Sequence, residues 1–160
     1  MRRILIAVDG SGHALEAVRH VIALVRDGRP SDVHLIHVQP PLTGDVTAFV
    51  SRDAVRDFHM DEARSAMRSA REMLDRAGIA YAVHIYIGYA APIIAECAHD
   101  LRCSLVVMGT HGFGKIAHWL VGSVSRETVH LIDPMIPVTL VKAGRAQTQP
   151  PRSPALWRPA

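Results

Sequence analysis

Five short apolar segments alternate with longer amphipathic ones along the chain. Ile4–Val8 and Leu105–Met108 are continuous apolar runs, typical of strands that are covered on both faces of a parallel sheet. Val33–Val38 and Tyr81–Ile87 alternate between apolar and polar residues, which favours outer strands. A last strand follows over Ile136–Val141, with a proline near its start. The two continuous runs are therefore the predicted central strands.

Between the strands, apolar residues recur at helical spacing. The four predicted helical segments run approximately over Ser11 to Gly28, Arg52 to Ala77, Pro92 to Leu101 and Phe113 to His130. In the first, Ser11 is the predicted N-cap, and the predicted buried stripe consists of Leu15, Val18, Ile22 and Val25. Strands that alternate with helices predict an α/β fold, an open five-stranded parallel sheet with helices on both faces.

Such sheets bind ligands outside the carboxyl ends of their strands, where the strand order reverses. Asp9 and Gly109 follow directly on the two predicted central strands. We therefore expect both residues to face one crevice. Asp9 has a second possible use as the turn residue before the first helix.

Composition and charge indicate a single globular domain over 1–142, because 49% of the 160 residues are hydrophobic. Residues 143–160 are rich in proline and contain three arginines and no acid, which predicts a disordered tail. Without those arginines, 15 basic residues face 15 acidic ones. We expect no nucleic-acid groove, no membrane span and a cytoplasmic protein. Cys97 and Cys103 form no CxxC pair and are predicted to be reduced, buried thiols.

The segment 106–125 is rich in glycine, and backbone amides there can approach a phosphate without interference from a Cβ atom. Gly109, Gly114 and Lys115 fit the first seven places of the P-loop motif G-x-x-x-x-G-K-[ST]. Ile116 occupies the place of the hydroxyl that binds Mg²⁺, which disfavours a P-loop enzyme.

A second template, the dinucleotide fingerprint G-x-G-x-x-[GA], is met by Gly112, Gly114 and Ala117. The ribose-binding acid of that fingerprint ends the following strand, whereas Asp133 precedes the last strand here. This placement ranks NAD binding below the other interpretations.

The third template is G-x2-G-x9-G-[ST], met by Gly109, Gly112, Gly122 and Ser123. Here the sequence resembles the ATP-binding branch of the universal stress protein family. The matching segments follow in the family's order and cover roughly residues 2–142: ILIAVDGS at 4–11, VVMGTHGFGK at 106–115, LVGSVS at 120–125 and IPVTLV at 136–141.

The resemblance implies strand order 3-2-1-4-5, binding of ATP or AMP, and a homodimer formed by antiparallel pairing of the Ile136–Val141 strands. It also implies that Asp9 lies near the ribose and a nucleotide-bound Mg²⁺, that the Val38 backbone contacts adenine, and that the glycine segments surround the phosphates. The implied binding residues are Ala7, Val8, Asp9, Val38, Met108, Gly109, Thr110, His111, Gly112, Gly114, Lys115, Gly122, Ser123, Val124 and Ser125.

The resemblance implies an ATP-binding stress-response sensor or regulator. We expect slow or no hydrolysis, because no general base or arginine finger is identifiable. No catalytic residue is assigned, and no downstream protein partner is predicted. Two alternatives stay open. The first is a Mg²⁺-dependent ATPase or phosphotransferase that uses Lys115 and Asp9. The second is an interaction protein that binds no nucleotide and works through its dimer edge and tail. The histidines match no metal-binding motif and are interpreted as scattered.

Overall fold

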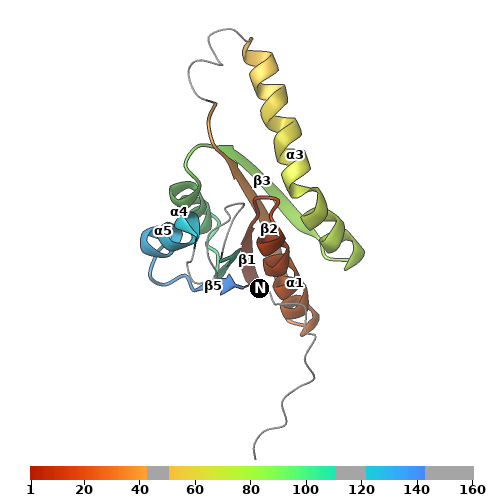
Figure 1. Cartoon of the computed structure of the whole chain (residues 1–160). Coiled ribbons are helices and arrows are strands. Elements are labelled where there is room, and N and C mark those ends of the chain that lie inside the picture. Colours follow the sequence, from red (N-terminus) through yellow and green to blue (C-terminus); the bar gives the residue numbers. More distant parts are fainter. Residues whose placement is uncertain (43–50, 111–121, 143–160) are drawn as a thin grey trace, which may run out of the picture.

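The computed structural model describes residues 1–42, 51–110 and 122–142 and has three layers, with helices on both faces of one sheet (Figure 1). In chain order, the described elements are β1 Arg2–Ala7, α1 Gly12–Arg26, β2 Ser31–Gln39, α3 Arg52–Arg76, β3 Tyr81–Ile87, α4 Ala90–Asp100, β4 Leu105–Gly109, α5 Ser123–Leu131 and β5 Val138–Val141. The prediction of a disordered tail falls on residues outside the described part.

The sheet contains five parallel strands in the order β3-β2-β1-β4-β5, which confirms the predicted fold and strand order. Strand β1 lies in the middle, where Ile6 is opposite Leu35 of β2 and Val107 of β4. Ile4, Leu5 and Ile6 are fully buried, because helices cover both faces of the sheet here. The apolar pattern of the two central strands was therefore a reliable signal.

The expectation that Val33–Val38 is an outer strand is wrong for β2, which lies between β1 and β3. Its alternating pattern arises from two histidines that are buried. His37 Nδ1 lies 2.9 Å from the Val8 carbonyl oxygen and donates to it, and His34 contacts His84 of β3. These two polar positions thus mark internal contacts and not exposure to solvent.

One layer is formed by α1 and α3, which pack on the face of the sheet that carries Ile4, Ile6, Leu35 and Val107. The buried side of α3 contains Ala63, Met67, Ala70 and Leu74, as predicted. The buried side of α1 is different, because only Val18 of the predicted stripe is buried, together with Ala14, Ala17 and Val21. The two alanines allow the helix backbone to come close to the sheet.

The other layer is formed by α4 and α5 over Leu5, Ile36 and Val106. Both cysteines are free and lie in this layer, as predicted. Burial raises the pKa of the Cys103 thiol to about 11, so the thiol stays protonated and unreactive at neutral pH.

Three element boundaries differ from the predictions. Helix α4 begins at Ala90 and tolerates Pro92 in its first turn, where an amide has no helical acceptor. Helix α5 begins at Ser123, because Gly122 is extended with φ −56° and ψ 153°. The earlier part of that predicted helix, 113–121, lies outside the described residues. Strand β5 begins at Val138, after a turn in which the Ile136 amide donates to the Asp133 carbonyl.

Candidate functional site

The predicted crevice lies at the carboxyl ends of β1 and β4, which are paired with Ala7 opposite Met108. The chain leaves β1 toward the layer of α1 and leaves β4 toward the layer of α5, so the strand order reverses between these two strands. This is the place where open α/β sheets bind ligands. Asp9 and Gly109 both belong to this end of the sheet.

Gly109 is required by the close approach of α1. A Cβ atom at this position would lie 2.7 Å from the carbonyl carbon of His13, 2.8 Å from its oxygen and 3.0 Å from the amide nitrogen of Ala14. All three are backbone atoms, so no side chain can move aside to accommodate a methyl group. The first turn of α1 is thereby held directly against the end of β4.

The second glycine segment meets the first at this point. The Gly122 amide donates to the Thr110 carbonyl, and Ser125 Oγ donates to the Gly109 carbonyl over 2.8 Å. The Thr110 amide in turn donates to the carbonyl of Val141 over 3.0 Å. These bonds join the end of β4 to the start of α5 and to β5, so residues separated in sequence by a dozen positions form one surface.

The N-terminus of α5 presents amide groups at this surface. The first amide that donates within the helix is that of Arg126, to the Gly122 carbonyl, so the preceding three amides have no intrahelical acceptor. Gly122 has no side chain to cap them, and the first turn of α5 contains no acidic residue. Ser123 and Val124 are exposed, whereas Ser125 is buried. An uncapped helix start with a positive dipole end favours a phosphate.

Asp9 forms the turn between β1 and α1. Its Oδ1 accepts the Ser11 amide over 2.9 Å, and Ser11 Oγ then caps the helix by accepting the Ala14 amide over 3.2 Å. The turn use of Asp9 is therefore present, and it fixes the half-buried carboxylate beside the glycine surface. An ionised carboxylate can accept more hydrogen bonds than this one, so Asp9 is suited to contact a ribose hydroxyl or a cation.

Magnesium fits this arrangement only together with phosphate oxygens. In the described part of the chain, no three His, Cys, Asp or Glu side chains gather as a metal site. Mg²⁺ commonly uses one or two carboxylates, several waters and the phosphates of a nucleotide. The Asp9 carboxylate is suited to supply the single protein ligand.

The remaining predicted residues divide into two groups. Ala7, Val8 and Met108 are buried, and the Val8 amide donates to the Ile36 carbonyl, so these residues form the floor of the site. Val38 is half-buried on the α4 side of β2. The other group lies outside the described residues and consists of His111, Gly112, Gly114 and Lys115. Lys115 is the lysine on which the ATPase alternative depends.

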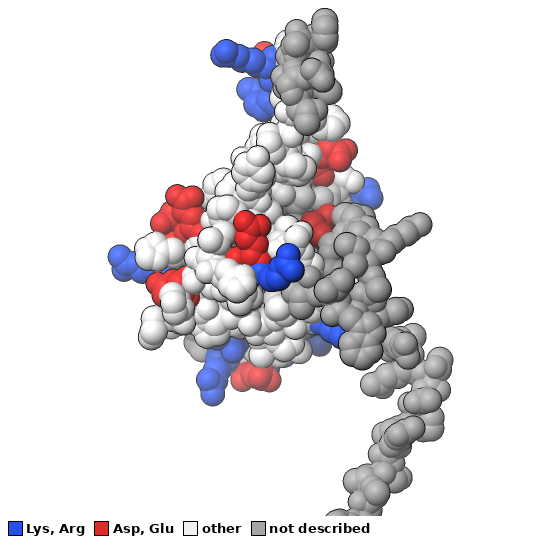
Figure 2. Space-filling model, turned by 60° about the vertical axis from the view of Figure 1, so that its left-hand side comes forward, with Lys and Arg blue, Asp and Glu red and all other residues white. Residues whose placement is uncertain are grey.

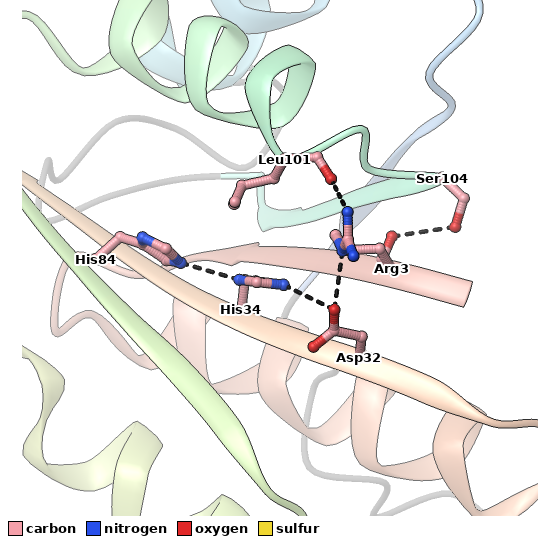
Figure 3. A network of polar contacts seen from close by, with 6 residues as sticks. All are labelled: Arg3, Asp32, His34, His84, Leu101 and Ser104. Atoms are coloured by element: carbon pink, nitrogen blue, oxygen red, sulfur yellow. Dashed lines mark hydrogen bonds and ion pairs between the residues drawn. The ribbon is translucent and has the colours of Figure 1, made fainter. Parts of the chain in front are cut away.

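Sequence reasoning missed a polar network that runs from the amino ends of β1 and β2 to the middle of β3 (Figure 3). His34 and His84 were interpreted as scattered histidines, but they contact each other across β2 and β3. Each occupies a polar position in a strand that is otherwise largely apolar. That position was the available signal, and the strand register was needed to pair the two residues.

On the face shown in Figure 2, basic and acidic side chains of the described residues are interspersed among uncharged ones. The absence of a nucleic-acid partner stays a prediction. No helix in the described ranges is long and apolar enough to cross a membrane.

Three solved structures with adenine nucleotides share this fold. A universal stress protein from Archaeoglobus fulgidus in complex with dAMP has a TM-score of 0.63 at 22% identity, and the match covers 89% of this chain and 98% of that one. An Arabidopsis thaliana family member with AMP bound and a universal stress protein in complex with cAMP have TM-scores of 0.64 and 0.65, at 18% and 23% identity.

Two further proteins are more similar to this chain in sequence. The universal stress protein MJ0531 of Methanocaldococcus jannaschii is 28% identical over 152 residues, which cover 91% of this chain and 85% of that protein. The structure of the hypothetical protein MJ0577 has a TM-score of 0.76 at 26% identity, covering 91% of this chain and 98% of that one. A model of the universal stress protein family matches residues 1–142. The chain therefore belongs to the universal stress protein family.

Proposed function

We propose that this protein binds an adenine nucleotide at the carboxyl ends of β1 and β4 and works as a cytoplasmic sensor or regulator in the stress response. The observation that carries the proposal is the junction of the two glycine segments, where Gly122 and Ser125 hydrogen-bond to Thr110 and Gly109. This junction places the open amides of α5 beside Gly109, and both lie at the reversal of strand order.

The phosphates would accept hydrogen bonds from the amides at the start of α5, with Ser123 as a further donor. Asp9 would hold the ribose or the Mg²⁺ that accompanies ATP. Adenine would lie toward the end of β2, near the Val38 backbone. The complexes of family members with AMP, cAMP and dAMP support an adenine nucleotide as the ligand class.

A second copy of the chain is the proposed structural partner. Among the strands of the described residues, β5 lies at an edge of the sheet and pairs only with β4. Its residues Val138, Leu140 and Val141 are only half-buried. Antiparallel pairing of two β5 strands would satisfy the edge and cover these side chains.

We assign a sensing role because the described groups of the proposed site are suited to binding a nucleotide and not to activating water. They comprise backbone amides, hydroxyls and one carboxylate already engaged by the Ser11 amide. A nucleotide that binds one conformation of the protein more tightly would raise the population of that conformation, and a partner would recognise it.

Calorimetric titration of the full chain with Mg·ATP tests this function. We expect one nucleotide to bind per protomer of a particle that sediments as a dimer, with no sustained release of phosphate. At a ligand concentration about 100 times the Kd, binding should also stabilise the fold by about 2.7 kcal/mol. Absence of both heat and thermal stabilisation would contradict nucleotide binding. A monomer in sedimentation would contradict the dimer, and multiple turnovers would support the ATPase alternative.

A further inference from the structure

A chain of polar side chains runs from the amino ends of β1 and β2 to the middle of β3, away from the proposed nucleotide site (Figure 3). Arg3 Nε donates to Asp32 Oδ2 over 2.8 Å, and Arg3 Nη1 donates to the Leu101 carbonyl after α4. His34 Nε2 lies 3.2 Å from the same Asp32 oxygen, an ion-pair contact that lacks the alignment of a hydrogen bond. His34 Nδ1 lies 2.9 Å from Nε2 of His84.

The last contact limits how many protons the pair can hold. Two imidazole nitrogens at 2.9 Å need one N–H donor and one bare acceptor. The neutral pair meets this condition, and so does the pair with one added proton, which leaves a single N–H between the rings. With a second added proton, both facing nitrogens carry hydrogen and both rings are charged. The contact then changes from attractive to repulsive.

Burial strengthens this limit. The side chain of His34 is only 10% exposed, whereas His84 is half-buried and open to protons from solvent. Burial, and secondarily the charge of His34, lowers the pKa of His84. The hydrogen bond from Arg3, and secondarily the contact with His34, lowers the pKa of Asp32, so this carboxylate stays ionised in mild acid.

Other titratable groups surround the network on the same layer. They are Tyr86 on β3, Glu96, Cys97 and Asp100 on α4, and Cys103 before β4. Burial raises the pKa of Tyr86, Cys97 and Cys103, so these three stay neutral. Glu96 and Asp100 are exposed on α4. Within the described residues, the contact of His34 with His84 is thus the part of this cluster that a second added proton changes from attractive to repulsive.

We propose that the His34–His84 pair is a proton-binding site that loosens the edge strand β3 from β2 on acidification. Among the described strands, β3 pairs only with β2, so a repulsive contact on this face acts on the one strand pairing that joins β3 to the sheet. The exposed residues Val83, Tyr86 and Ile87 lie on this strand. Loosening it would expose the edge of β2 in mild acid, an edge that β3 covers at neutral pH.

The direction of the effect follows from proton linkage. The pKa of His84 in the folded state is below the value of about 6.5 for an unfolded histidine. The unfolded chain therefore binds more protons as the pH falls through 6.5. The stability that neutral His84 contributes above this pH is lost as the pH falls toward the lowered pKa of His84 in the folded state.

The test compares the wild type with His84→Gln, whose amide can still hydrogen-bond to His34 without titrating. His130→Gln, which removes an exposed histidine of α5, is the matched control. We measure urea midpoints and deuterium uptake of residues 81–87 at pH 7.5 and 5.0, with uptake corrected for intrinsic exchange rates. The wild type and the control should show a lower midpoint and several-fold faster uptake in β3 at pH 5.0, whereas His84→Gln should change clearly less.

Equal pH responses of His84→Gln and the wild type would overturn the proposal, as would acid-induced exchange spread evenly over all strands. If His84→Gln does not fold, the imidazole ¹⁵N shifts of the wild type decide. Coupled titration of the two histidines, with one step well below pH 6.5, supports the proposal. Two independent titrations near pH 6.5 contradict it.

Discussion

Alanine at position 109 is expected to lower the free energy of unfolding by about 3 kcal/mol, the upper part of the usual cost of overpacking a tight site. The added methyl group would meet the His13 carbonyl carbon at 2.7 Å, and only a shift of α1 or β4 can relieve this contact. Because both elements position the proposed site, nucleotide affinity should fall as well. Urea denaturation and calorimetric titration with Mg·ATP measure the two effects.

Gly12→Ala is the matched control for this substitution. Gly12 begins α1, close in sequence to the residues that Gly109 contacts, and a Cβ atom there would meet nothing within 4 Å. Alanine is the better helix former, so this variant should be neutral or more stable by up to about 1 kcal/mol. If Gly109→Ala is as stable as Gly12→Ala, then α1 does not press on the end of β4 as described.

Aspartate at position 123 is expected to weaken binding of Mg·ATP about 100-fold, equivalent to about 2.7 kcal/mol, without loss of the fold. Ser123 is exposed in the first turn of α5, so a larger side chain has room. A carboxylate near a helix N-terminus stabilises the helix by about 0.3–1 kcal/mol. The same carboxylate repels phosphate groups that bind there. Stability and affinity should therefore change in opposite directions.

Ser123→Asn separates charge from size, because asparagine has nearly the shape of aspartate and is neutral. Its affinity for Mg·ATP should stay much closer to that of the wild type. Raised salt should reduce the difference between the Asp and Asn variants, since exposed charges are screened. Wild-type affinity in Ser123→Asp would exclude the start of α5 as the phosphate site.

The central strands were predictable because burial on both faces produces a simple sequence pattern, an uninterrupted apolar run such as Ile4–Val8. The position of β2 was not, because a buried histidine with a partner has the same sequence pattern as an exposed one. His34 and His37 are of this kind. The strand order came from the family resemblance, since residue patterns alone do not specify which strands are neighbours.

For the site, spacing suggested that Gly109 and Gly122 act together, but the reason is visible only in three dimensions. Ser125 bonds to the Gly109 carbonyl, and the missing Cβ of Gly109 makes room for His13, which is distant in the sequence. The start of α5 was also misplaced, because a pattern of apolar residues continues through Gly122 although its backbone is extended. Contacts between distant segments decide such boundaries.

The most direct test of the account is to map amide chemical shifts of the full chain as Mg·ATP is added. The account predicts that the largest shifts fall on three separate segments, 8–11, 109–110 and 122–125, and that they saturate together with one Kd. Saturating shifts confined to other parts of the sheet, or no shifts at millimolar nucleotide, would contradict it.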